Sequence, residues 1–361
     1  MDKLNERQLN ILEEVTLNED FSSSDVLDLI NKKQKISLVT IKRDLDYLTD
    51  FEYLKRKGKG RSTVYQKTIK GTLFSPANLS EYDSVEPDQR RGSDSFNFRL
   101  FKEFPLNIFS ADEKNVLNSA TIQYKKKIRK ITPMIHSKEL ERFIIELSWK
   151  SSKIEGNTYT LLDTERLIRE GIPAKGHSQN ETTMIINHKK AFSFILDNIE
   201  NFKKRGVTVA FLEKVHEIII EKLGVSRGIR NGLVGIIGTK YKPLDNRYQV
   251  KEALESLCQL VNKMENVYSS ALTLLIGLSY IQPFEDGNKR TARLLCNAVL
   301  LSKNCAPLSY RSIDEDTYKK SILVFYEKNS LIPMKEIFIE QYIFSTQNYL
   351  VNAPSSPART S

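Results

Sequence analysis

A short stretch near residue 285 carries the side chains best suited to chemistry. It reads QPFEDGNKRTAR over residues 282–293 and leads directly into an apolar helical pattern. A glycine-containing turn at a helix start exposes backbone N–H groups at the positive end of the helix dipole, where a phosphate can bind. Arg290 and Arg293 lie three residues apart on one predicted helix face, so both can reach one pyrophosphate. The stretch therefore predicts a site for a phosphate-bearing ligand.

Two further charges in this stretch fit the same ligand. Asp286 offers a hard carboxylate oxygen of the kind that Mg²⁺ prefers, and Lys289 adds positive charge beside the two arginines. Taken alone, the stretch is equally compatible with Asp286 capping the helix and the cations forming a solvated face. The longer pattern favours the ligand site.

The whole pattern resembles the Fic-family signature, His-x-Phe-x-Asp/Glu-Gly-Asn-Gly-Arg-x-x-Arg. The resemblance implies a protein that binds ATP with Mg²⁺ and transfers AMP to a Ser, Thr or Tyr hydroxyl of a target protein. We expect Gln282 and Arg290 at the catalytic positions and Asp286 as the magnesium ligand. The expected nucleotide-binding residues are Asp286, Gly287, Asn288, Lys289, Arg290 and Arg293.

The chain departs from this signature at two positions. Gln282 stands where the family has its general-base histidine, and an amide cannot accept a proton near neutral pH. Loss of a positioned base typically lowers a rate by about 10²–10⁴-fold, so we expect lowered or lost activity. Lys289 replaces a glycine, which also resembles the Doc branch, whose members resemble kinases in the group transferred, whereas Arg293 favours AMP transfer. A nucleotide-sensing transcription regulator without catalysis is the alternative hypothesis.

A second resemblance lies about 130 residues upstream. Ser151 and Glu155 are one helical turn apart and are followed by Gly156, in a predicted helix over about 139–156. Alone, this is an ordinary helix end with a glycine stop. It resembles the family's autoinhibitory motif, Ser/Thr-x-x-x-Glu-Gly/Asn, which implies that Glu155 pairs with Arg293 and inhibits productive ATP binding.

Residues 1–70 indicate a separate small domain. Two amphipathic helices precede a third, for which Ser37 is the expected N-cap, and a basic glycine-containing hairpin follows. In the third helix Thr40, Lys42, Arg43, Asp44 and Tyr47 are expected to face outward. The segment resembles a winged helix-turn-helix of the DeoR type, which implies DNA binding, with protein contact or dimerisation as the alternative. The expected DNA-binding residues are Thr40, Lys42, Arg43, Tyr47, Lys57, Lys59 and Arg61.

The remaining segments complete a mainly α fold. Proline, serine and glycine predict a linker over 71–95, and helical periodicity predicts an all-helical Fic domain over 96–347. Within it, the β-prone segment 232–244 is expected to form a β-hairpin flap, and 348–361 a disordered tail.

Composition restricts the partners and the cellular location. A formal net charge of +10 favours an anionic partner, which fits both ATP and DNA. No apolar run approaches the roughly 20 residues of a membrane span, and the polar start lacks a secretory signal, so we expect a cytoplasmic protein without a membrane partner. Cys258, Cys296 and Cys305 show no metal-binding spacing and are expected to be buried thiols. A homodimer is compatible with these features.

Overall fold

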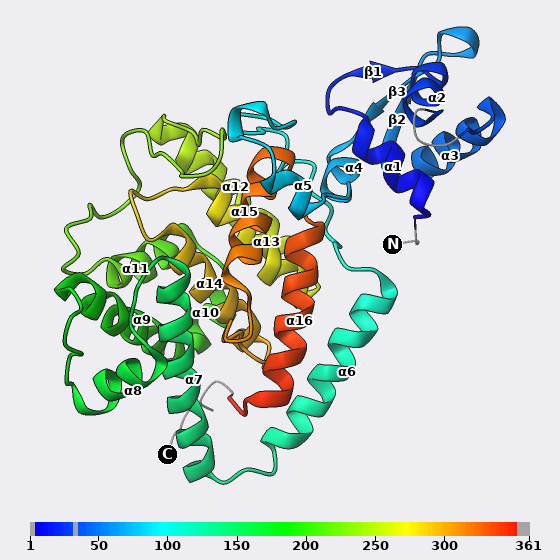
Figure 1. Ribbon diagram of the computed structural model, residues 1–361. Helices are drawn as coiled ribbons and strands as arrows, with labels where there is room; N and C mark the ends of the chain where they lie inside the picture. Colours follow the sequence, from blue (N-terminus) through cyan, green and yellow to red (C-terminus); the bar gives the residue numbers. More distant parts are fainter. Residues whose placement is uncertain (1–3, 32–34, 352–361) are drawn as a thin grey trace. The chain divides into compact units, whose positions relative to one another are not determined.

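Helices dominate the computed structural model, which describes residues 4–31 and 35–351 (Figure 1). The mainly helical fold expected from the sequence is thus confirmed. The chain forms two compact units. The first comprises the residues up to Pro105 together with Ile237–Tyr241 and Lys320–Glu336, and the second comprises Leu106–Ile236, Lys242–Lys319 and the residues from Ile337 onward. Among the described residues no helix is both long enough and apolar enough to cross a membrane.

The first unit begins with a small helical domain around an antiparallel sheet. Its helices are α1 (Glu6–Glu14), α2 (Ser23–Asn31) and α3 (Leu38–Asp50), and its strands are β1 (Asp20–Phe21), β2 (Leu54–Lys57) and β3 (Val64–Lys67) in the order β1-β3-β2. Ser37 caps α3 by accepting a hydrogen bond from Thr40 N, as expected. Ile41, Leu45 and Leu48 are buried on the inner face of α3. The apolar face of this amphipathic helix is thus its buried face.

The segment predicted as a linker, 71–95, is structured. It contains the end of α4 (Ile69–Leu73), α5 (Leu79–Asp83) and a 3₁₀ turn, η2 (Pro87–Gln89). Phe74 and Tyr82 are buried, and the guanidinium of Arg90 lies 4.2 Å from the Tyr82 ring centroid. The linker prediction was wrong here because two aromatic anchors hold a segment whose composition is otherwise typical of a loop.

The second unit is built from long helices around a buried pair. Its helices, two of which extend into the first unit, are α6 (Ala111–Ile128), α7 (Pro133–Ile154), α8 (Leu161–Glu170), α9 (Gln179–Asp197), α10 (Ile199–Arg205), α11 (Val209–Ile219), α12 (Arg247–Lys263), α13 (Val267–Ile281), α14 (Asn288–Ser302), α15 (Glu315–Lys328) and α16 (Ile332–Asn348). Helices α13 and α14 pack against each other, and α7, α9, α10 and α11 also contact α14. Because α13 is apolar on every side, it forms the core rather than a surface. The loop between α13 and α14 is therefore held at each end by a buried helix.

The segment 232–244 is not a β-hairpin. It contains a turn at Ile237 and Gly238 but no strand. Side chains bind backbone groups that a β-ladder would use. Glu327 accepts from Lys240 N at 3.2 Å, and Arg90 donates to Gly238 O at 2.7 Å. The predicted β-hairpin is therefore wrong, and the segment is a loop in which Ile237 is 97% exposed.

The C-terminal end of the described chain is packed. Helix α16 ends at Asn348, and the following Tyr349 and Val351 are buried. The expected disordered tail over 348–361 is thus wrong for its first four residues, because the apolar side chains continue the core beyond the last helix. Residues 352–361 of that prediction lie outside the described residues.

Candidate functional site

The stretch 282–293 forms a tight loop followed by the first turns of α14. Helix α13 ends at Gln282, which adopts the left-handed conformation, and α14 begins after Gly287, which has a φ of 80°. A Cβ on Gly287 would also lie 3.3 Å from side-chain carbons of Ile219 and Ile220. Glycine is therefore required here both by the backbone conformation and by the close approach of α11. No side chain caps the first turn of α14, so Asp286 is not the helix cap that the sequence left open.

Asn288 closes the loop from inside. Its side chain is buried, accepts from Phe284 N at 2.9 Å and donates to Phe284 O at 2.8 Å. It also donates to Oε1 of Gln282 at 2.9 Å. The side chain of Asn288 thus holds the loop in shape, because its hydrogen bonds go to loop residues.

The side chain of Gln282 is engaged within the protein. Its Nε2 donates to Ser279 O at 2.6 Å, while its Oε1 accepts from Asn288. The residue is 6% exposed. The amide therefore connects the end of α13 to the start of α14.

Arg290 and Arg293 are the largest fully buried side chains in the described part of the chain. Arg290 donates through Nη2 to Asp286 Oδ2 at 2.8 Å. On each arginine, Nη1 is buried and has no hydrogen-bond partner among the described residues. Buried polar groups are nearly always satisfied, and a guanidinium without its partners is especially unfavourable. Both groups lie on the same face of α14, near its start.

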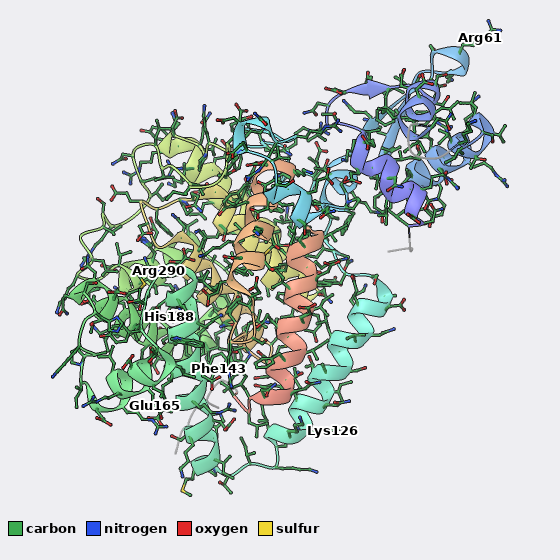
Figure 2. The ribbon with its side chains drawn as sticks, viewed as in Figure 1. Arg61, Lys126, Phe143, Glu165, His188 and Arg290 are labelled. Atoms are coloured by element: carbon green, nitrogen blue, oxygen red, sulfur yellow. The ribbon has the colours of Figure 1, made fainter. Side chains whose placement is uncertain are left out.

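The two imidazoles beside this loop, His188 and His216, are neutral at physiological pH, so its positive charge comes from Lys289, Arg290 and Arg293. Burial, with Arg293 and Arg290 nearby, lowers the pKa of His188 well below its usual value, and Figure 2 shows His188 and Arg290 on α9 and α14. Burial also lowers the pKa of His216 to about 4, although its hydrogen bond to Asp286 O opposes this effect. The His216 ring stacks on Phe284 with 3.7 Å between centroids. His216 therefore supports the loop as an uncharged donor.

Helix α7 brings the second predicted motif to the same place. It begins at Pro133, earlier than the expected residue 139, and Glu155 is its C-cap. Arg293 donates through Nη2 to Glu155 Oε1 at 2.9 Å and through Nε to Ser151 Oγ at 2.9 Å. The Glu155–Arg293 pair implied by the resemblance is thus present in the structure. Gly156 follows with a φ of 95°, which ends the helix.

Glu155 has a second cationic partner. Lys289 donates through Nζ to Glu155 Oε2 at 3.1 Å. Burial by itself would raise the pKa of Glu155, but the charges of Arg293 and Lys289 outweigh that effect and lower it to about 2. The carboxylate is therefore ionised throughout the physiological pH range.

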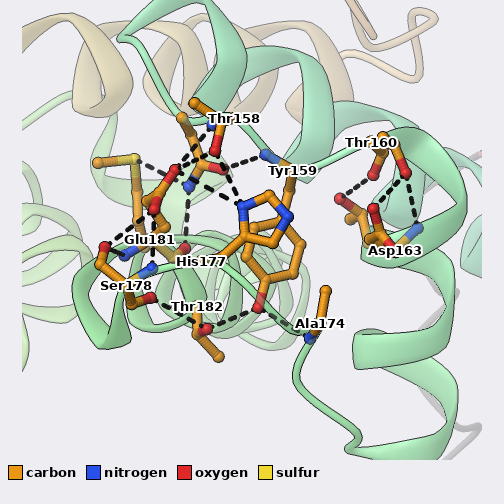
Figure 3. Close-up of polar contacts among 12 residues, drawn as sticks. Thr158, Tyr159, Thr160, Asp163, Ala174, His177, Ser178, Glu181 and Thr182 are labelled. Atoms are coloured by element: carbon orange, nitrogen blue, oxygen red, sulfur yellow. Dashed lines mark hydrogen bonds and ion pairs between the residues drawn. The ribbon is translucent and has the colours of Figure 1, made fainter.

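The segment after Gly156 is anchored by residues that the sequence analysis missed. Figure 3 shows Glu181 of α9 accepting from Thr158 N at 2.9 Å and from Thr158 Oγ1 at 2.6 Å. The other carboxylate oxygen of Glu181 accepts from Ser178 N at 2.9 Å, and His177 Nδ1 lies 2.9 Å from Thr158 Oγ1. These hydrogen bonds, led by the Thr158 hydroxyl, lower the pKa of Glu181 to about 2. The Ser178-x-x-Glu181 spacing of a capping box was the available signal.

The predicted DNA-binding residues lie on the small domain as follows. In α3, Lys42 and Arg43 are exposed, and Thr40 and Tyr47 are half-buried. Lys57, Lys59 and Arg61 are exposed at the end of the hairpin, where Figure 2 labels Arg61. Asp44 was expected to face outward but is 4% exposed, because it pairs with Arg7 and accepts from Gln8.

Comparisons with known proteins find similarity to the Fic/DOC family in one part of the chain. Residues 206–300 match the Fic/DOC family. A protein adenylyltransferase Fic of Nematostella vectensis is 25% identical over 173 residues, covering 47% of this chain and 40% of that protein. The protein adenylyltransferase fic-1 of Caenorhabditis elegans is 23% identical over 181 residues, covering 48% of this chain and 35% of that protein. This chain thus aligns with less than half of the length of either relative.

Solved structures share the fold at low identity. Fic-1 of Caenorhabditis elegans, residues 134–508, has a TM-score of 0.58 and 16% identity, covering 95% of this chain and 96% of that chain. A Fic domain containing signaling protein from Bacteroides thetaiotaomicron has a TM-score of 0.55 and 20% identity, covering 64% of this chain and 94% of that chain.

Proposed function

We propose that this chain, whose residues 206–300 form a Fic/DOC-family domain, binds Mg–ATP at the start of α14 and is related in function to protein adenylyltransferases. In this proposal Glu155 inhibits productive binding, and Gln282 lowers or abolishes AMP transfer. The observation that carries the proposal is the pair of buried guanidinium groups, Arg290 and Arg293, each with an unsatisfied Nη1.

The residues present fit a nucleotide triphosphate. The uncapped first turn of α14 offers backbone N–H groups and a positive dipole end to a phosphate, and Gly287 lets the phosphate come close. Arg290 and Arg293 would supply planar, charged donors, which suit phosphate oxygens. The curated relatives carry the name protein adenylyltransferase, which supports ATP as the nucleotide.

Asp286 is the carboxylate that would hold Mg²⁺. Its side chain is 66% exposed, so it can reach a ligand outside the loop, although one of its oxygens now accepts from Arg290. A bound Mg²⁺ would neutralise part of the phosphate charge. Arg290, released from Asp286, would then be available to the phosphates.

The reaction requires a base that Gln282 does not supply at the position of the family's histidine. In AMP transfer a hydroxyl oxygen of the target protein bonds to the α-phosphorus, pyrophosphate leaves, and the hydroxyl proton must be accepted by another group. Gln282 cannot accept it, and both ends of its amide are already bonded to Ser279 and Asn288. The rate is therefore expected to be lower by about 10²–10⁴-fold than with a histidine at this position.

Glu155 supplies the inhibitory contact. Its carboxylate accepts from Nη2 of Arg293, a donor that a terminal phosphate would use. Because the carboxylate is ionised and 17% exposed, ATP must displace a charge-assisted contact in a partly buried setting. Productive binding of ATP is thus penalised until Glu155 moves.

The small N-terminal domain is proposed to bind DNA as a winged helix. The exposed cations of α3 and of the hairpin, including Lys59 and Arg61, support a contact with the phosphate backbone. A regulator that senses ATP without any chemistry is less favoured, since the curated relatives are named as adenylyltransferases.

Calorimetric titration with Mg–ATP tests the nucleotide site. Arg290→Ala, made in a Glu155→Gly background, should weaken binding more than tenfold, because charge-assisted contacts contribute about 1.5–3 kcal/mol each. Arg227→Ala is the control, since Arg227 is 71% exposed and pairs with Glu217 at 2.8 Å. An equal dissociation constant for both arginine variants would contradict the assignment.

A further inference from the structure

The start of α14 concentrates positive charge that the chain itself must balance. Lys289, Arg290 and Arg293 occupy its first two turns, at the positive end of the helix dipole. Cations are unfavourable there, and like charges four residues apart repel. Asp286 pairs with Arg290, and Glu155 contacts the other two cations.

We propose that Lys289 is a positioning residue that clamps the inhibitory carboxylate, so that Glu155 is held by two cations rather than by Arg293 alone. The proposal rests on the proposed function, because it concerns how strongly that site is inhibited. Lys289 stands where the quoted Fic-family signature has a glycine, which has no side chain that could make the second contact.

Each carboxylate oxygen of Glu155 has a different cationic partner. Oε1 of Glu155 accepts from Arg293 at 2.9 Å, and Oε2 accepts from Lys289 at 3.1 Å. Since Lys289 and Arg293 are one helical turn apart, the carboxylate bridges both donors without a change of rotamer. Removal of the lysine amine leaves the Arg293 contact in place and loosens one oxygen.

The backbone behind Glu155 is fixed, which makes the clamp effective. Glu155 caps α7, and the Thr158–Glu181 hydrogen bonds hold the next turn of chain against α9 (Figure 3). A carboxylate on a fixed backbone loses little freedom when it is bound, so a second contact adds directly to the inhibition. The Lys289 side chain is 31% exposed and the Glu155 side chain 17%, so solvent screens the contact in part.

A double-mutant cycle separates this role from direct contact of Lys289 with phosphate. Mg–ATP dissociation constants are measured by calorimetry for the unaltered chain, Lys289→Met, Glu155→Gly and the double variant. Methionine keeps most of the apolar stem and removes the charge. The factor by which Lys289→Met lowers the Mg–ATP dissociation constant should be about threefold to tenfold larger with Glu155 present than in the Glu155→Gly background.

A control variant and a second measurement test the contact between Lys289 and Glu155 independently of ATP binding. Lys190→Met removes a lysine that pairs at 2.8 Å with Glu221 and should show no coupling to Glu155. Equal effects of Lys289→Met in both backgrounds overturn the clamp. If Glu155→Gly fails to bind ATP, the proposed function is wrong, and urea unfolding decides the clamp instead. There, Lys289→Met and Glu155→Gln should couple by about threefold to tenfold in the unfolding constant, and zero coupling overturns the clamp.

Discussion

Glu155→Gly should change stability and nucleotide affinity in opposite directions. The carboxylate accepts from Nη2 of Arg293, which is fully buried, and in the proposed function it blocks this donor against ATP. Its removal therefore destabilises the ligand-free protein and strengthens Mg–ATP binding. A residue with a purely structural role would give the first effect without the second.

The magnitudes follow from the contacts. Removal of one partner of a buried ion pair costs about 3–5 kcal/mol. Arg293 keeps its bonds to Ser151 Oγ and Ser151 O, at 2.9 and 2.8 Å, so the loss in unfolding free energy should lie at the lower end, about 3 kcal/mol. For ATP, a displaced charge-assisted hydrogen bond corresponds to about 2 kcal/mol, or about a thirtyfold lower dissociation constant.

Urea unfolding without nucleotide and calorimetry with Mg–ATP measure the two effects. Glu170→Gly is a matched control, because Glu170 is likewise a glutamate at a helix end before a glycine with positive φ, but it is 58% exposed and pairs loosely with Arg166 at 3.6 Å. The control should change neither quantity by more than about 1 kcal/mol. A Glu155→Gly variant that unfolds like the unaltered chain and binds ATP no more tightly would refute the reasoning.

Three further outcomes are expected. Glu155→Gln should reduce the unfolding free energy at pH 7, and this deficit should close as pH falls from 4.5, the ordinary pKa, to about 2 in the folded state; a deficit that closes above pH 5 would contradict the assigned charge. Thr158→Val should strengthen Mg–ATP binding a few-fold in calorimetry by loosening the backbone behind Glu155, and an unchanged constant would argue against the anchor. Lys59→Ala with Arg61→Ala should weaken binding to any DNA duplex and reduce the salt slope by about 2, and an unchanged slope would exclude the hairpin from the contact.

Local patterns in the sequence predicted the turn and the helix start at residues 282–293. The turn through Gly287 and the helix face carrying Arg290 and Arg293 depend on residues close in sequence, so periodicity and glycine placement were sufficient. The Glu155–Arg293 contact spans 138 positions and came from the family resemblance instead. No local pattern would have connected these two residues.

The errors arose where distant side chains decided the local structure. Asp44 faces inward because Arg7, on another helix, supplies its counter-charge. The segment around Gly238 lacks a β-ladder because Arg90 and Glu327 take up backbone groups that a partner strand would have used. The contact of Lys289 with Glu155 also required the three-dimensional arrangement, while its role in nucleotide binding stays a prediction.

In the proposed function, the chain carries an AMP-transfer site in which Gln282 replaces the general base and Glu155 inhibits productive ATP binding. It is tested most directly by AMP transfer from α-labelled ATP with Mg²⁺, with self-modification as the readout. The unaltered chain is compared with Gln282→His, with Gln282→His plus Glu155→Gly, and with that double variant carrying Arg290→Ala. Label that rises by about 10²–10⁴-fold in the double variant and disappears with Arg290→Ala is predicted. Absence of label in every variant, despite measurable ATP binding, would contradict the claim.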